Sequence, residues 1–324
     1  MRQASTTHLT RIAEIDAHEG PVYVAGEDAL YFTTLPRRDA RGVPRVAIKR
    51  LSLDGESTVV RADANAANGM TLGRDGRLLV CEQGTPSTPA RVTALDPASG
   101  EVEVLVDNWR GLPLNSPNDV VQASDGAIWF TDPSYGFLQG FRPRPAVGDR
   151  VYRFEPASGR LDVVADGLDK PNGLALSPDE RTLYVTDSGA NQEPGSFHPD
   201  RPHNVVAFHV HPSGLTGERV FADISPGFPD GIKCDADGCV YVSSFSGVQI
   251  FSPRGERLGE IALPGVVNFC FGGRERNVLF ITTDTAVYAA DLAAKGAATR
   301  QGYPPGSSSP SRRRGRRCCH RRTW

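Results

Sequence analysis

Short runs of alternating apolar and polar residues, separated by turn residues, recur along most of the chain. Residues 68–80 are representative: the polar pair Asn68-Gly69, a short apolar stretch, a turn at Asp75-Gly76 and the apolar run 78–80. A period of two predicts β-strands, and Asp-Gly or Ser-Gly pairs between the runs predict hairpins. The pattern therefore indicates an antiparallel, all-β fold.

The same unit returns six times, starting at residues 19, 68, 118, 172, 230 and 268. In four copies a polar residue stands seven positions before the acid of a turn: Asn68 and Asp75, Asn118 and Asp125, Asn172 and Asp179, Asp230 and Asp237. Each copy continues into a second hairpin, as at 92–106, and four strands in about fifty residues are typical of one propeller blade. We predict a six-bladed β-propeller; a β-sandwich is the alternative, which the constant offset disfavours.

The two ends of the chain differ from the repeats. The last copy is one strand short after 286–292, and residues 9–15 have the length and alternation to supply that strand. Because an unclosed ring leaves an unpaired sheet edge, we expect residues 9–15 to close the last blade. We assign 1–292 to the propeller and 293–324, rich in Pro, Ser and Arg, to a disordered tail.

The charge is divided unevenly. The last 24 residues hold seven Arg and no acid, so the first 300 carry 29 basic against 38 acidic residues. An acidic body disfavours a nucleic-acid surface and is compatible with a cation site. The sequence has no apolar run long enough for a membrane span and no Cys-x-x-Cys pair. We expect a cytoplasmic protein with neither nucleic-acid nor membrane partners; the sequence does not determine its oligomeric state.

The first residues of the repeats have a chemical meaning beyond turn formation. Any single Asn-Gly pair is more typical of a tight connection. Equivalent residues of successive blades, however, converge on the central channel. They are two carboxylates and two amides: Glu19, Asp230, Asn118 and Asn172. Asn68 and Asn268 supply further amides at the related positions of the other blades. Such a set of oxygen donors suits a hard divalent cation such as Ca²⁺, Mg²⁺ or Mn²⁺.

Four segments resemble the gluconolactonase branch of the senescence-marker-protein/regucalcin family: 17–23, 114–136, 170–179 and 228–232. The resemblance covers about residues 9–291. It implies a six-bladed propeller that hydrolyses sugar lactones with one divalent ion, Ca²⁺ first and Zn²⁺, Mg²⁺ or Mn²⁺ as alternatives. It also implies that Glu19, Asn118, Asn172 and Asp230 are the metal ligands and that Asp230 is the general base. Ser116 stands where animal members have an arginine for sugar recognition, so their lactone preference is not carried over.

The mechanism expected from this resemblance is Lewis-acid activation of the lactone carbonyl, with Asp230 assisting the attacking water. Candidate substrate-binding residues are those that would line the channel or its mouth: Asn68, Asp132, Tyr135 and Asp187. The long interruption at 189–204 is a candidate lid. His18, beside Glu19, is either a neighbour of the metal or substrate or a histidine that contacts neither, and the second interpretation is favoured. Two alternatives stay open: a non-catalytic, metal-stabilised binding module, and a phosphotriester hydrolase on the same scaffold.

Overall fold

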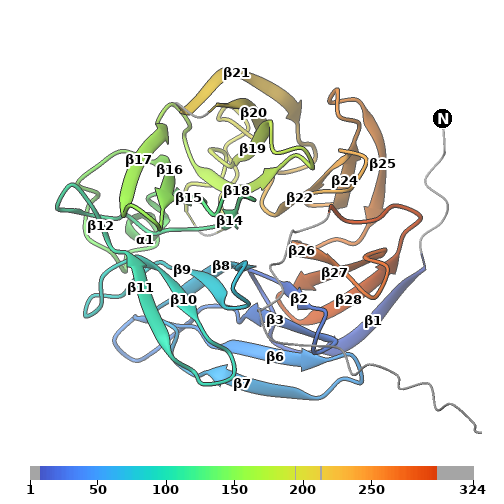
Figure 1. Cartoon of the computed structure of the whole chain (residues 1–324), viewed down its shortest axis with the longest axis horizontal. Helices are drawn as coiled ribbons and strands as arrows, with labels where there is room; N and C mark the ends of the chain where they lie inside the picture. The colour runs from blue at the N-terminus through green and yellow to red at the C-terminus, as the bar shows by residue number, and fades with distance from the viewer. Residues whose placement is uncertain (1–7, 194, 212–213, 298–324) are drawn as a thin grey trace, which may run out of the picture.

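Six four-stranded antiparallel sheets stand around a central axis in the computed structural model, which describes residues 8–193, 195–211 and 214–297 (Figure 1). The first three sheets consist of β2 (Val22–Val24), β3 (Ala29–Thr33), β6 (Ile48–Ser52) and β7 (Ser57–Arg61); β8 (Ala67–Leu72), β9 (Leu78–Glu82), β10 (Arg91–Leu95) and β11 (Val102–Val106); and β14 (Val120–Gln122), β15 (Ile128–Asp132), β16 (Arg150–Glu155) and β17 (Arg160–Ala165).

The other three sheets continue the ring in chain order. They consist of β18 (Pro171–Leu176), β19 (Thr182–Asp187), β20 (Asn204–His211) and β21 (Gly214–Asp223); β22 (Ile232–Cys234), β23 (Val240–Ser243), β24 (Gly247–Phe251) and β25 (Arg257–Ala262); and β26 (Val266–Gly272), β27 (Val278–Thr283), β28 (Ala286–Asp291) and β1 (Leu9–Glu14). We number these sheets blades 1 to 6. The predicted six-bladed propeller is confirmed.

The last blade is closed by the beginning of the chain. Strand β1 pairs antiparallel with β28, with Leu9 opposite Ala290 and Glu14 opposite Ala286. In Figure 1 the blue β1 lies beside the red β28. The predicted closure by residues 9–15 is confirmed, and it leaves no unpaired edge on β28.

Deleting residues 1–15 should lower the free energy of unfolding by about 3–5 kcal/mol, because Leu9, Ile12 and Ile15 leave the packing of blade 6. Chemical denaturation of the full and shortened chains measures this loss. As a matched control, Arg11→Gln on the exposed face of β1 should change stability by less than about 0.5 kcal/mol. An unchanged unfolding midpoint after the deletion would contradict the assignment.

The hydrophobic core lies between neighbouring blades. One cluster joins Leu79 and Val92 of blade 2 to Val120 and Phe130 of blade 3. The Phe130 ring also stacks on Tyr152 within blade 3, with ring centroids 5.1 Å apart. Because each sheet buries both faces against its neighbours, the second strands read as apolar runs, and all five residues of β3, β9 and β15 are buried.

The glycine that follows the polar residue in four of the six repeats permits a close approach of neighbouring inner strands. The Gly69 N–H donates to the Asn118 carbonyl at 2.7 Å. A Cβ added at Gly69 would lie 2.5 Å from that oxygen, and one at Gly173 would lie 2.3 Å from the Asp230 carbonyl. The polar residue and its following glycine therefore lie inside or beside an inner strand. The glycine is required because a larger residue would clash with the backbone of the next blade.

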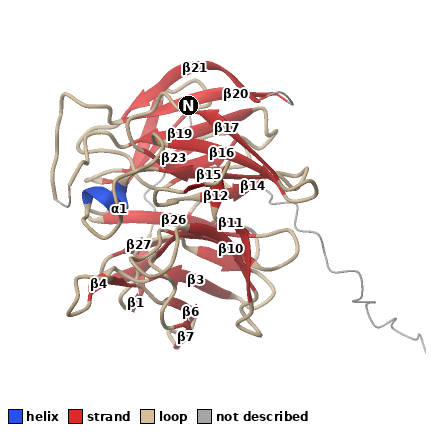
Figure 2. Cartoon of the chain, turned by 90° about the vertical axis from the view of Figure 1, so that its left-hand side faces the viewer, coloured by secondary structure: helices blue, strands red, loops and turns tan. Residues whose placement is uncertain are grey.

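Few of the helices and strands in the described residues lie outside the blades. They are the short helix α1 (Tyr135–Leu138) and two small hairpins, β4 (Arg37–Arg38) with β5 (Pro44–Arg45) and β12 (Asn108–Trp109) with β13 (Leu112–Pro113). In Figure 2, α1 and β4 lie on the same side of the ring. Among the described residues, no helix has the length and apolarity needed to cross a membrane.

The chain continues past β28 along blade 5. The Ala236 N–H donates to the Lys295 carbonyl at 2.7 Å, and Asp235 forms an isolated antiparallel bridge with Gly296. Residues 293–297 of the expected tail thus contact the propeller, whereas 298–324 lie outside the described residues. The boundary at 292 and the disorder of the tail stay predictions.

Candidate functional site

The predicted ligands lie at the start of the inner strands, where a threonine from the preceding blade supports the backbone. The Thr131 hydroxyl donates to the Asn172 carbonyl at 2.5 Å, and the Thr186 hydroxyl donates to the Asp230 carbonyl at 3.1 Å. In the same way, Thr33 donates to Asn68 at 3.1 Å. Sequence analysis missed these threonines, although a Thr ends the second apolar run of several repeats.

Two carboxyl groups from different blades meet at the axis. Glu19 is 4% exposed, and its Oε2 accepts from the Asn268 side-chain amide at 2.7 Å. Burial raises the pKa of Glu19. Burial and then the charge of Glu19 raise the pKa of Asp230 well above its ordinary value, although a hydrogen bond with Asn172 lowers it. Glu19, Asp230 and Asn172 therefore lie together, and a cation would relieve the repulsion between the two carboxylates.

The neighbouring amides carry unpaired oxygens. Oδ1 of Asn68 and Oδ1 of Asn118 are buried without a hydrogen-bond donor among the described protein atoms. A buried carbonyl oxygen that accepts no hydrogen bond costs about 1–3 kcal/mol, so such an atom requires an explanation. Carboxylate and amide oxygens with unused lone pairs fit a hard divalent cation.

A third carboxyl group, Asp119, was missed from the sequence. It is 2% exposed, and its Oδ1 accepts from the Val120 N–H at 2.9 Å. The Lys233 ammonium lies 3.8 Å from its Oδ2. Burial raises the pKa of Asp119, and Lys233 partly opposes that effect. The sequence does mark this residue, because Asp119 occupies the position after the polar residue of the repeat, where most repeats have a glycine.

The repeat pattern predicts that Asn268 is equivalent to Asn118, but in the structure Asn268 lies one residue later along its strand than that equivalent position. The Gly231 N–H donates to the Val267 carbonyl at 3.3 Å, the contact that Gly69 makes with Asn118. Val267 is therefore the blade 6 counterpart of Asn118, and Asn268 is the counterpart of Asp119. Because of this shift, the apolar Val267 occupies the blade 6 position where other blades have a polar residue. The Asn268 amide instead donates to Glu19.

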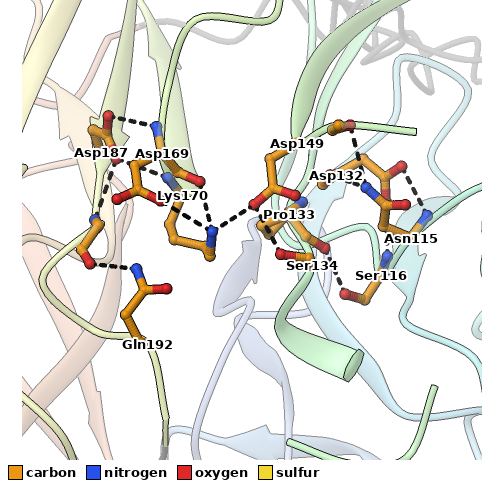
Figure 3. A network of polar contacts seen from close by, with 12 residues as sticks. Asn115, Ser116, Asp132, Pro133, Ser134, Asp149, Asp169, Lys170, Asp187 and Gln192 are labelled. Atoms are coloured by element: carbon orange, nitrogen blue, oxygen red, sulfur yellow. Dashed lines mark hydrogen bonds and ion pairs between the residues drawn. The ribbon is translucent and has the colours of Figure 1, made fainter. Parts of the chain in front are cut away.

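Two of the predicted substrate-binding residues, Asp132 and Asp187, hold the backbone that leads into the site (Figure 3). The carboxylate of Asp132 accepts from the N–H groups of Asn115 and Ser116 at 2.9 and 2.8 Å. The carboxylate of Asp187 accepts from the N–H of Lys170 at 2.8 Å, in the equivalent place of the next blade. These contacts position the segments that precede Asn118 and Asn172 in the chain. Direct contact of either aspartate with substrate stays a prediction.

A buried lysine joins blades 3 and 4 at the same level. The Lys170 ammonium lies 2.9 Å from Asp149 and 3.1 Å from Asp169, and Figure 3 shows it between the two carboxylates. Lys170 is only 7% exposed. Because removing one partner of a buried ion pair leaves the other charge unpaired, this link fixes the two blades relative to each other.

Tyr135, the first residue of α1, lies close to Asp230. Its hydroxyl is buried beside the Ser188 and Asn172 side chains, with no partner at full hydrogen-bond geometry among the described residues. Burial, and next the charge of Asp230, raise the pKa of Tyr135 well above its ordinary value. The hydroxyl therefore stays protonated and is an available donor beside the carboxyl pair, which fits its predicted role in substrate binding.

The candidate lid and the neighbouring histidine are both tied to the propeller. Within 189–204, the Ala190 N–H donates to the Pro202 carbonyl at 2.8 Å, and Arg201 forms an ion pair with Asp169 at 2.8 Å. His18 pairs with Asp284 through its Nδ1 at 2.8 Å. Movement of the lid stays a prediction.

Asp132 should make stability depend on pH. Burial raises its pKa from 3.8 to about 7. Between pH 4 and 7 the unfolded carboxyl ionises while the folded one keeps its proton, so stability falls as the pH rises, by up to about 4 kcal/mol. Urea unfolding at pH 4.5 and 7.5 should show a larger loss in the native protein than in Asp132→Asn, where buried carboxyls such as Asp119 still contribute. Asp166→Asn, which is exposed, is the matched control; an equal loss in Asp132→Asn contradicts the assignment.

No three His, Cys, Asp or Glu side chains gather as a metal-ligand cluster within the described part of the chain. The predicted set has two acids and two amides, so this result leaves it untested. The assignment of Glu19, Asn118, Asn172 and Asp230 as metal ligands and of Asn68 as a substrate ligand stays a prediction.

Known proteins share this fold and much of this sequence. The SMP-30/gluconolactonase/LRE-like region matches residues 17–285. A gluconolactonase of Zymomonas mobilis is 34% identical over 289 residues, which cover 83% of this chain and 77% of that protein. The solved structure of a gluconolactonase from Xanthomonas campestris superposes with a TM-score of 0.75 at 34% identity, over 90% of this chain and 91% of the other.

A more distant structure supports the fold alone. The calcium-binding protein regucalcin from Agrobacterium tumefaciens has a TM-score of 0.70 at 17% identity, over 91% of this chain and 97% of the other. The family match spans the segments on which the resemblance was based, from Glu19 to Asp230. The chain belongs to the SMP-30/gluconolactonase/LRE family.

Proposed function

We propose that this protein is a metal-dependent hydrolase that opens sugar lactones. The observation that carries the proposal is the meeting of Glu19 and Asp230 at the channel axis, beside the Asn172 amide. Family membership and the similarity to gluconolactonases support the substrate class. Such a site offers what ester hydrolysis needs: a base for water and stabilisation of an oxyanion.

Four residues would hold the ion: Glu19, Asn118, Asn172 and Asp230. The unpaired Oδ1 of Asn118 and the raised pKa values of the two carboxyls support this set. A bound divalent cation would supply a Lewis acid for the negative charge that develops on the lactone carbonyl oxygen. Ca²⁺ is our first choice because all four donors are oxygens; Zn²⁺, Mg²⁺ and Mn²⁺ are the alternatives.

Asp230 would act as the base. Its carboxylate takes a proton from water as the water oxygen bonds to the carbonyl carbon. The bond between this carbon and the ring oxygen then breaks, and the proton on Asp230 passes to the leaving alkoxide, which yields the hydroxy acid. Tyr135 would donate a hydrogen bond to a substrate oxygen, and the Asn68 amide would hold a substrate hydroxyl.

The identity of the sugar is a separate question. Ser116 is fully buried; its hydroxyl donates to the Pro133 carbonyl at 2.6 Å and accepts from the Gly136 N–H at 2.9 Å. Its hydrogen-bonding capacity is thus taken by the backbone, and it offers nothing that resembles a sugar-binding arginine. This supports treating the lactone preference of the animal enzymes as not transferable.

A substrate panel tests the proposal. The protein is assayed on aldonolactones and on an organophosphate, after chelation and after re-addition of individual divalent ions. We expect metal-dependent lactone hydrolysis that exceeds organophosphate hydrolysis. Faster organophosphate turnover would favour the phosphotriesterase alternative, and metal-dependent melting without any turnover would favour the binding module. The cytoplasmic location stays a prediction.

A further inference from the structure

The end of the channel opposite to Glu19 and Asp230 contains a cavity of about 580 Å³. It is lined by the later residues of the six inner strands and by the turns that follow them, such as Ser124 and Arg274. Ser124 lies six residues after Asn118, or about 20 Å along an extended strand. Its inner wall includes Pro21, Met70 and Val120, each two residues beyond a residue of the proposed lactone site, so the cavity begins next to that site and extends to the opposite end of the channel. Its volume lies within the range of small-molecule pockets.

The cavity walls are mainly apolar, and cationic residues also line it. Side chains of the inner strands supply the apolar surface, among them Val22, Met70, Leu72, Val120, Leu176 and Phe271. Three arginines come from the strand ends or the turns beyond them: Arg74, Arg274 and Arg276. Among the described lining residues Glu180 is the one acid. An apolar interior with a cationic edge suits a ligand that has an apolar body and an anionic head.

The contacts of the charged lining residues show which cationic side chains are free to bind an anionic group. Glu180 is already engaged, because its carboxylate accepts from the N–H and the hydroxyl of Ser124 at 2.9 and 2.6 Å. Lys233, deeper in the channel, has Asp119 as its counterion at 3.8 Å. Arg74 donates to the Ser124 carbonyl, whereas Arg274 and Arg276 form no ion pair with any described residue. These two arginines are therefore the available partners for an anion.

The C-terminal segment reaches the same mouth. Ala297 lines the cavity, and its N–H donates to the Cys234 carbonyl at 3.3 Å. The sequence that follows contains seven Arg and no acid within its last 24 residues. Like charges repel, so the arginines at the mouth disfavour this cationic segment as the occupant and favour a separate anionic molecule.

We propose that this cavity is a second ligand site, which binds a medium-chain organic carboxylate with its apolar body against the inner strands and its head at Arg274 and Arg276. No part of this proposal depends on the lactonase chemistry. The carboxylate gains charge-assisted hydrogen bonds from guanidinium groups, while the hydrocarbon leaves water.

Binding of octanoate to the full chain tests the proposal. The fluorescent probe 8-anilinonaphthalene-1-sulfonate is bound first, with chelator present and no lactone, and is then displaced. We expect saturable displacement by octanoate and none by octylamine at the same concentration. The double variant Arg274→Gln/Arg276→Gln should bind octanoate at least tenfold more weakly, and Arg160→Gln, an exposed arginine on β17, should bind it normally.

Two checks separate a lost site from a lost fold and from a failed lactonase assignment. Thr71→Phe, which narrows the cavity from β8, should weaken displacement. Thr71→Phe, the double variant and the native chain should share one unfolding midpoint. Lactone turnover should be equal in the double variant and the native chain. Equal octanoate affinity in the double variant, displacement by octylamine, or no displacement at millimolar octanoate would overturn the proposal and leave the lactonase prediction as it stands.

Discussion

Asp230→Asn is expected to lower kcat for lactone hydrolysis by about 10²–10⁴-fold at saturating metal. The amide keeps the shape of the carboxylate and one oxygen donor, but it cannot accept a proton from water. The expectation rests on the position of Asp230 beside Glu19 and Asn172, where burial and the neighbouring charge raise its pKa. Steady-state kinetics on the lactone that the native protein hydrolyses fastest measure the effect.

The matched control for this variant is Asp223→Asn, an exposed aspartate at the end of β21. It should leave kcat unchanged. The metal content of Asp230→Asn must be determined together with its rate, because the same residue is a predicted ligand. Full activity of the metal-loaded Asp230→Asn protein would show that another group activates the water.

Removal of the divalent ion should have the second largest effect, with a loss of at least about 10²-fold in lactone turnover. It should also destabilise the protein. An ion present at 100 times its dissociation constant contributes about 2.7 kcal/mol, which corresponds to a fall in Tm of about 4–5 °C for a domain of this size. Without the ion, Glu19 and Asp230 face each other, and the Asn172 and Asn268 amides and the Gly20 N–H are uncharged partners that do not neutralise them.

Chelation followed by addition of single ions tests this prediction, with calorimetric melting recorded beside the rate. Ca²⁺ should restore both quantities. A metal-free protein that melts at the same temperature and hydrolyses lactone at the same rate would mean that the oxygen donors at the axis serve another purpose. Recovery of Tm without recovery of activity would assign the ion a structural role.

The architecture was predictable because it repeats. A constant offset of seven residues between a polar position and a turn acid, as between Asn118 and Asp125, follows from the fixed length of the inner hairpin. Closure by β1 was predictable because a missing strand leaves an edge that the chain must cover. The glycines, interpreted first as turn residues, are explained by backbone contact with the next blade, which no single repeat reveals.

Details that differ between blades were harder to predict. In blade 6, Val267 rather than Asn268 occupies the position equivalent to Asn118, a difference of one residue in register. In blade 3, Asp119 stands where four other repeats have a glycine. Asp132 was expected near substrate, but its oxygens accept from backbone N–H groups that the sequence does not place beside it. The arginines of the second cavity lie in turns and share no motif, so only the fold brings them together.

Side chains from four blades are predicted to bind one divalent ion in the channel. Isothermal titration of the metal-free protein with Ca²⁺ tests this prediction most directly, in the native chain and in Glu19→Gln and Asn172→Leu. We expect one ion per chain, with affinity at least tenfold weaker in both variants. Native affinity in both variants, or no binding by the native chain to any of the four candidate ions, would contradict it.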